Sequence, residues 1–124
     1  MSEPGSRSSE SGSTEPIAKL LATIAGQARR TNQVRIEQIR ATLERAGEHQ
    51  VDRAGWGAAE RTAHQLAGSA GTFGFAGVSE RARQLERFFA DAIVVAPDQG
   101  RLAAARVVLE EASAQLDDDL QLDY

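Results

Sequence analysis

The chain of 124 residues contains no cysteine, which excludes disulfide bonds, thiolate zinc sites and cysteine nucleophiles. A reducing, cytoplasmic compartment is therefore the expected localisation. Long apolar runs are missing as well. No stretch approaches the roughly 18 consecutive apolar residues of a membrane span, and the N-terminal segment lacks the apolar core of a signal peptide. We expect a protein that neither spans nor is anchored to a membrane.

Basic residues are too few for a nucleic-acid-binding protein. Lys and Arg number 14 against 18 Asp and Glu, and the formal net charge is -4. The middle of the chain, residues 16–109, holds thirteen basic and nine acidic residues without interleaved aromatics. This weakly basic surface predicts no nucleic-acid partner. It suits an acidic protein partner slightly better, although a solvated surface of mixed charge is the alternative interpretation.

The length and the changes in composition predict one domain with polar ends. Residues 1–15, rich in Ser, Gly and Glu, are too polar to bury a core and are expected to form a disordered leader. Residues 16–120 should form the folded domain, which we expect to be monomeric. Residues 121–124 should be a frayed acidic tail, because negative charge at a helix C-terminus opposes the helix dipole.

From Pro16 onward the apolar residues recur at helical spacing, and no segment alternates as a strand would. Residues 17–24 predict a short helix that begins at Pro16, with a break or kink near Gly26. Four longer helices are expected over residues 28–46, 59–73, 78–89 and 98–120. Their short connections favour antiparallel neighbours. The predicted fold is all-α: an antiparallel up-and-down four-helix bundle with a short additional N-terminal helix.

Several single residues refine this bundle. Gly47 is expected to end its helix in a left-handed cap, and Asp98 to cap the last helix. Trp56 is expected in the core or at the end of its helix as a capping residue, with an exposed docking role as the alternative. His49 is expected in a solvated loop. The bundle does not indicate a function, because the same architecture hosts carriers, cytokines, metal sites and scaffolds.

His64 is the residue best suited to chemistry. Ala63 and Leu66 belong to the apolar seam of the 59–73 helix, so His64 is turned about 100° away from Ala63. We therefore expect an imidazole that is at least partly exposed. Near pH 7 such a ring is largely neutral and nucleophilic.

Two glycines follow His64 in the same helix. Gly68 and Gly71 each lower helix stability by roughly 1 kcal/mol relative to alanine, so their presence requires a reason. One interpretation is that they clear space for a second protein to approach His64. The other is close packing of a neighbouring helix within the chain.

The run Ala63–Phe75 resembles the motif of histidine-containing phosphotransfer (HPt) domains: His, any residue, Leu, Lys, Gly, Ser, small residues, then a bulky residue before Gly. The positions that match are His64, Leu66, Gly68, Ser69, Ala70, Phe73 and Gly74. Further along, Arg83, Leu85 and Glu86 resemble the Leu-Glu ending of such domains. The predicted helix order and length also agree with this family.

The resemblance implies a phosphoryl carrier of bacterial two-component phosphorelays rather than an enzyme. HPt domains accept a phosphoryl group on a ring nitrogen, usually Nε2, from a phosphoaspartate of one receiver domain and pass it to another. For this chain, the resemblance implies that His64 is the phosphoacceptor and that receiver domains of response regulators and hybrid histidine kinases are the partners. Mg²⁺ would come from the receiver, so we expect no metal and no cofactor in this chain. The predicted supporting or docking residues are Arg61, Gln65, Ala67, Gly68 and Gly71.

Ala67 departs from the motif, because the family usually has a Lys there, where a cation steadies the phosphoryl group. Arg61 is the nearest replacement in the same helix, and Arg35 or Arg40 of the preceding helix are further candidates. The departure keeps open an alternative function, a helical docking module that binds a receiver domain or histidine kinase without accepting phosphate. An enzyme ranks third, because no titratable groups converge in the sequence.

Overall fold

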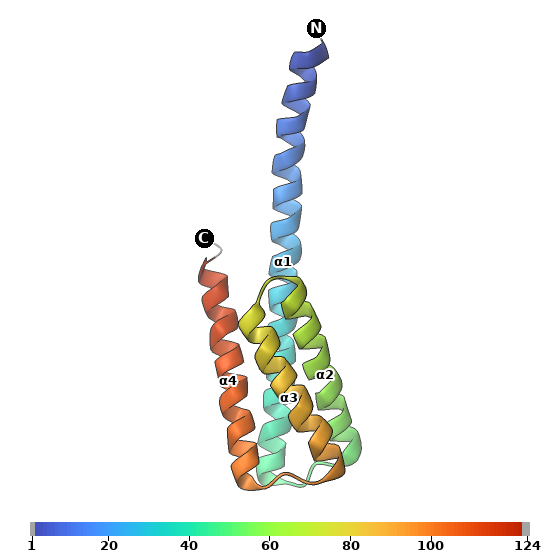
Figure 1. The fold of residues 1–124 in the computed structure, drawn as a ribbon, viewed down its shortest axis with the longest axis vertical. Helices are drawn as coiled ribbons and strands as arrows, with labels where there is room; N and C mark the ends of the chain where they lie inside the picture. The colour runs from blue at the N-terminus through green and yellow to red at the C-terminus, as the bar shows by residue number, and fades with distance from the viewer. Residues whose placement is uncertain (1, 123–124) are drawn as a thin grey trace.

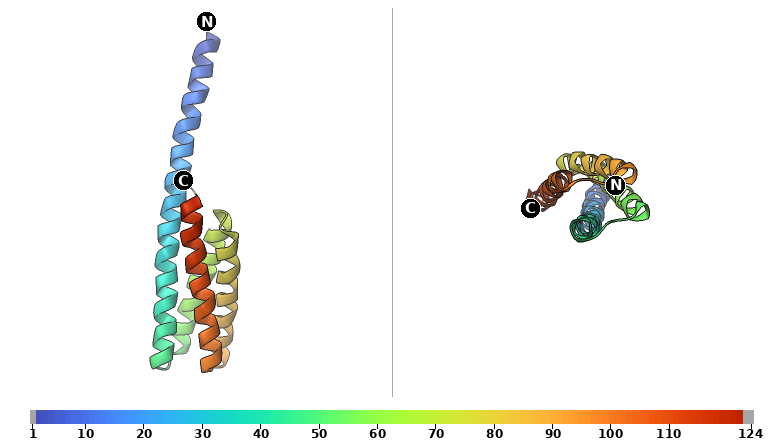
Figure 2. Two further views of the ribbon diagram at one scale, coloured as in Figure 1. Left: turned by 90° about the vertical axis from the view of Figure 1, so that its left-hand side faces the viewer. Right: turned by 90° about the horizontal axis from the view of Figure 1, so that it is seen from below.

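The structure, a computed structural model, describes the backbone of residues 2–122 and the side chains of residues 15–118. Its helices are α1 (Ser2–Glu48), α2 (Arg53–Thr72), α3 (Ala76–Val94) and α4 (Gln99–Leu122). Figure 1 shows them running alternately up and down. Both α1 and α3 contact α2 and α4, and Figure 2 shows the same arrangement from the side and from below. The described part of the chain is an antiparallel four-helix bundle, which confirms the predicted fold class.

The N-terminal half of α1 differs from the prediction. Residues 17–24 do not form a separate short helix, because α1 continues through Gly26 without a break. Pro16 lies inside α1 rather than in a first turn. A glycine lowers helix stability by only about 1 kcal/mol, which weakens a helix without ending it. The predicted additional helix is therefore the upper part of α1.

The ends of the chain were predicted to lie outside the folded domain. In the structure the backbone of residues 2–15 is helical as part of α1, where we predicted a disordered leader. Residues 121 and 122 belong to α4, and residues 123–124 of the predicted frayed tail lie outside the described residues. The domain limits of 16–120 stay a prediction.

Two helices begin with a side-chain cap. Asp52 Oδ1 accepts the backbone N–H of Gly55 at 2.7 Å and starts α2. Asp98 Oδ1 accepts the N–H of Arg101 at 2.8 Å and starts α4, as predicted. Each bond satisfies one of the free N–H groups of a first helical turn.

Glycine supplies a left-handed residue at one place among the described residues. Gly74, with a φ of 84°, turns the chain from α2 into α3. The Phe75 N–H that follows donates to the Ala70 carbonyl at 2.8 Å and closes the helix end. Gly47 does not form the predicted left-handed cap, because α1 continues in helical conformation to Glu48.

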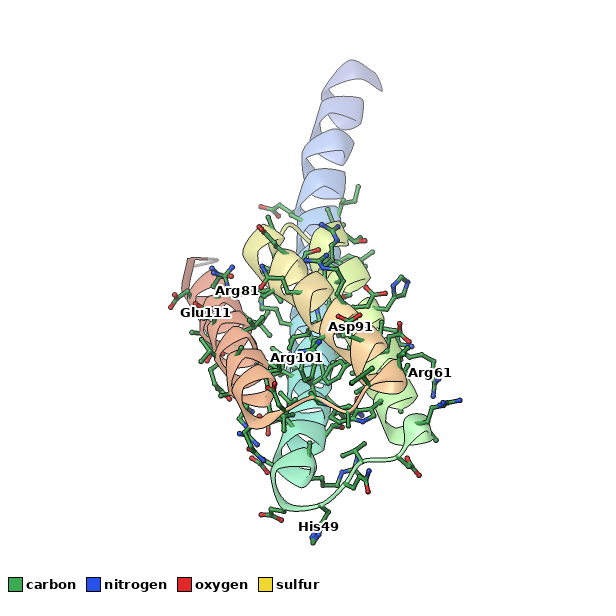
Figure 3. The ribbon with its side chains drawn as sticks, turned by 60° about the horizontal axis from the view of Figure 1, so that its bottom comes forward. His49, Arg61, Arg81, Asp91, Arg101 and Glu111 are labelled. Carbon is green, nitrogen blue, oxygen red and sulfur yellow. The ribbon has the colours of Figure 1, made fainter. Side chains whose placement is uncertain are left out.

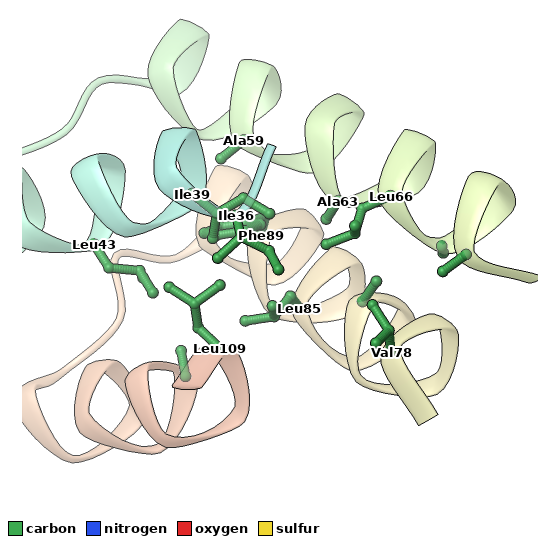
Figure 4. Close-up of a cluster of buried hydrophobic side chains, with 14 of the residues drawn as sticks. Ile36, Ile39, Leu43, Ala59, Ala63, Leu66, Val78, Leu85, Phe89 and Leu109 are labelled. Atoms are coloured by element: carbon green, nitrogen blue, oxygen red, sulfur yellow. The ribbon is translucent and has the colours of Figure 1, made fainter. Parts of the chain in front are cut away.

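The core draws apolar side chains from all four helices. Figure 4 shows this cluster, in which Ile39, Leu66, Phe89 and Leu109 are each at most 1 % exposed. Trp56 is buried as predicted and stacks on Phe89 with ring centroids 5.9 Å apart. The buried stripe of α2 fixes the rotation of this helix, so the outward direction of its polar residues is fixed too.

The upper part of α1 extends beyond the other three helices (Figure 1). It carries the exposed apolar side chains of Ile17, Leu20, Leu21 and Ile24. In the described part of the chain, no helix has the length and apolar character that crossing a membrane would require.

Candidate functional site

His64 lies on the outer face of α2. Ala63 and Leu66 are fully buried on the inner face of the same helix. The His64 side chain is 74 % exposed, which confirms the exposure expected from the helical periodicity. A reagent can therefore reach the ring without any rearrangement of the bundle.

Glu86 of α3 orients the imidazole. Its Oε2 lies 2.9 Å from Nδ1 of His64, and the carboxylate itself is only 30 % exposed. An ionised carboxylate accepts hydrogen bonds and cannot donate them, so the ring proton belongs on Nδ1. In the neutral ring this leaves Nε2 with a free lone pair. In this tautomer Nε2 is the ring nitrogen that is free to form a new bond.

A groove of about 460 Å³ runs between α2 and α3 beside His64. From α2 it is lined by Glu60, His64, Ala67 and Gly68, and from α3 by Arg83, Glu86, Arg87 and Ala90. The groove thus combines a nucleophilic ring with two cations and two carboxylates. Its floor contains small residues, which leaves room for a group attached to the ring.

The two glycines after His64 have different surroundings. A Cβ at Gly68 would meet nothing within 4 Å, so packing inside this chain does not require a glycine there. A Cβ at Gly71 would lie 3.3 Å from Oγ of Ser79, whose hydroxyl donates to the Ala67 carbonyl at 2.8 Å. Close packing of α3 therefore accounts for Gly71, whereas the space above Gly68 is open to another molecule.

The remaining predicted residues of α2 separate into two groups. Ala67 lines the groove although it is only 4 % exposed. Gln65 and Arg61 are exposed but do not line the groove. The guanidinium of Arg61 lies near Gly57, one turn before it, where a Cβ would be 3.6 Å away. Figure 3 shows Arg61 on the outer edge of α2. Because its guanidinium lies toward Gly57, the side chain is directed toward the start of α2 and not toward His64.

The two arginines of α1 that we considered as replacements bind elsewhere. Arg40 forms hydrogen bonds of 2.9 Å to both carboxylate oxygens of Glu110 on α4. This bond raises the pKa of Arg40 and lowers the pKa of Glu110. Arg35 donates to Oδ1 of Asn32 at 2.9 Å, and Asn32 in turn donates to Ser69 of α2 at 3.2 Å. Neither arginine lines the groove.

The groove also contains residues of α3 that sequence reasoning missed. Arg83 and Glu86 entered the sequence comparison only as part of a motif, and Arg87 was not considered. Their spacing, just beside the buried positions Leu85 and Phe89, predicts a partly exposed helix face. No sequence pattern, however, indicates that this face meets His64.

No metal site is evident among the described residues. They contain no group of three or more His, Asp or Glu side chains that could hold an ion. The expectation that Mg²⁺ is supplied by a partner stays a prediction.

A family model described as the Hpt domain matches residues 18–122. The match covers nearly the whole chain and includes both helices that form the groove. The chain matches no curated protein and no solved structure.

Proposed function

Because the chain belongs to the Hpt domain family and so has a phosphotransfer role in two-component signalling, we propose that it is a phosphorelay intermediate. His64 accepts a phosphoryl group from the aspartate of one receiver domain and passes it to another. The observation that carries this proposal is the 74 % exposed imidazole, whose Nδ1 is held by Glu86 at 2.9 Å. The chain acts as a carrier and has no kinase activity of its own.

The hydrogen bond to Glu86 suits this chemistry. Nε2 attacks phosphorus, the bond between phosphorus and the aspartyl oxygen breaks, and the receiver regains its free carboxylate. The ring keeps its proton on Nδ1, so it becomes positively charged as the phosphorus–nitrogen bond forms. The nearby carboxylate of Glu86 stabilises that charge. No proton has to move, and the reverse transfer to a second receiver uses the same contacts.

The surroundings of the ring suit the approach of a partner. The receiver supplies Mg²⁺ and its own acidic cluster, so this chain has to provide mainly access and position. The open space at Gly68 lets the receiver surface come close to α2. Arg83 and Arg87 in the groove favour an acidic partner.

The test is to incubate the protein with a receiver domain that carries radiolabelled phosphate on its aspartate. The wild-type chain should gain an acid-labile, alkali-stable label, and His64→Gln should gain none while keeping its helical circular dichroism. His49→Gln is the matched control, because His49 is also exposed but lies in the loop after α1. A label of the same stability on His64→Gln would show that the assignment is wrong.

The second candidate function is docking without phosphoryl transfer. Ala67 favours it, because the Lys that the family usually has at this position is missing. A docking module would bind the receiver with measurable affinity by calorimetry and yet stay unlabelled in the same incubation.

A further inference from the structure

Two pairs of facing residues show the register between α2 and α3. Nδ1 of His64 is 2.9 Å from Oε2 of Glu86. Seven residues later on α2, a Cβ at Gly71 would lie 3.3 Å from Oγ of Ser79, which is seven residues before Glu86 on α3. The antiparallel helices therefore stay in register over about two turns.

This register places Arg83 across the groove from Ala67. Ala67 is three residues after His64, and Arg83 is three residues before Glu86, so the two occupy equivalent levels of the paired helices. Both residues line the groove. The HPt motif usually has a Lys at the position of Ala67. The small methyl group of Ala67 leaves space into which a side chain from α3 can extend.

Arg83 and Arg87 are one turn apart on α3, and both are exposed. Among the described residues neither has an ion pair or a hydrogen bond from its guanidinium. By contrast, Nε of Arg81, on the other side of α3, is 3.6 Å from Oε1 of Glu111. Figure 3 labels both side chains, on α3 and α4. The guanidinium groups beside His64 are therefore available for a ligand.

A phosphoryl group on His64 requires a cation at this place. It would bring close to two negative charges into a groove that already contains the carboxylates of Glu60 and Glu86. The negative charges of the phosphoryl group and of the two carboxylates would repel one another unless a cation lies between or beside them. A guanidinium matches the geometry of phosphate oxygens and binds two of them at once.

We propose that Arg83, from the helix opposite His64, binds the phosphoryl group in place of the Lys missing at Ala67, with Arg87 as a second cation one turn away. This inference rests on the proposed function, because it assigns the phosphoryl-binding residue of the same site. It replaces the prediction that Arg61 takes this role.

The test loads His64 without a receiver, by incubation with phosphoramidate, which transfers its phosphoryl group to Nε2 and releases ammonia. The lifetime of the phosphohistidine and its equilibrium with a receiver domain are then compared in the wild-type chain, Arg83→Ala and Arg87→Ala. Arg61→Ala tests the rival position. Ala67→Lys is made alone and together with Arg83→Ala, because a lysine at position 67 should restore the missing charge.

Arg83→Ala should shift the equilibrium away from the phosphorylated chain by up to about fivefold, the upper end of what an exposed charge pair contributes. The shift should shrink at high salt. Arg61→Ala should change it by much less, and Ala67→Lys should recover most of the loss in the Arg83→Ala chain. The coupling between positions 67 and 83 in this double-mutant cycle is the decisive quantity.

The inference is wrong if the phosphoryl-transfer equilibrium is the same for the wild-type chain and Arg83→Ala, or if Arg61→Ala shifts it more. Labelling by a receiver would in that case still support the proposed function. If Arg83→Ala shortens the lifetime of the phosphohistidine formed with phosphoramidate, but no receiver labels the wild-type chain, the result would support the inference and refute the proposed relay. Absence of labelling by both donors would overturn both.

Discussion

Replacing Glu86 with alanine should move the proton of the His64 ring from Nδ1 to Nε2 and slow phosphoryl transfer. A hydrogen bond to a charged acceptor is worth about 1.5 to 3 kcal/mol when it is shielded from solvent. Here the histidine side chain is 74 % exposed and the glutamate 30 % exposed, so solvent screening reduces this to roughly 1 kcal/mol. That corresponds to about a fivefold change in the ratio of the two tautomers.

Nitrogen NMR of the imidazole at a pH where the ring is neutral measures this ratio directly. The wild-type chain should show more of the tautomer with the proton on Nδ1 than a free histidine does. In Glu86→Ala the ratio of the Nε2-protonated to the Nδ1-protonated tautomer should rise about fivefold. The rate of transfer from a phosphorylated receiver should fall by up to this factor, because only an unprotonated Nε2 can attack. Glu86→Gln should be intermediate, since its amide oxygen still accepts a hydrogen bond.

Glu60→Ala is the matched control. Glu60 lines the same groove and carries the same charge, but has no hydrogen bond to His64 among the described residues. It should leave the tautomer ratio unchanged. If Glu86→Ala also leaves that ratio unchanged, or if both variants slow transfer equally, then Glu86 acts through the charge of the groove and not through the hydrogen bond.

Two further predictions concern stability. Gly68→Ala should raise the free energy of unfolding by up to about 1 kcal/mol. Gly71→Ala should raise it by less, because the added Cβ would lie 3.3 Å from Oγ of Ser79. Equal gains for the two variants in urea unfolding would show that this contact is unimportant. Glu110→Gln should lower the free energy of unfolding by less than about 1 kcal/mol at neutral pH, since its bond to Arg40 is exposed. The pKa of Glu110 is lowered in the folded chain, so this contribution is complete above the ordinary carboxyl pKa and is lost as the pH falls through the folded value. Unfolding curves that still differ in strong acid would contradict this assignment.

The sequence by itself determined the helical class and the direction of single side chains. The spacing of apolar residues follows the 3.6-residue repeat of a helix, so it predicted the outward His64. Trp56 was predicted to be buried because Trp side chains usually are. The cap at Asp98 could be predicted as well, because a capping bond involves only neighbouring residues.

Local sequence patterns did not predict correctly where the first helix begins or whether it is interrupted. Pro16 and Gly26 both weaken a helix. We predicted that a helix would begin at Pro16 and break near Gly26, yet α1 passes through both residues. Such residues alter the stability of a helix by a limited amount, so they do not by themselves decide whether it ends.

Only the tertiary structure decided which groups surround His64. Helical periodicity gives the face on which a residue lies, but not the helix that this face meets or the register between the two. Packing of the α2 and α3 side chains set that register and brought Glu86 to Nδ1 and Arg83 to the level of Ala67. The same packing joined Arg40 to Glu110, 70 residues away, and so removed it from the site that the sequence had suggested for it.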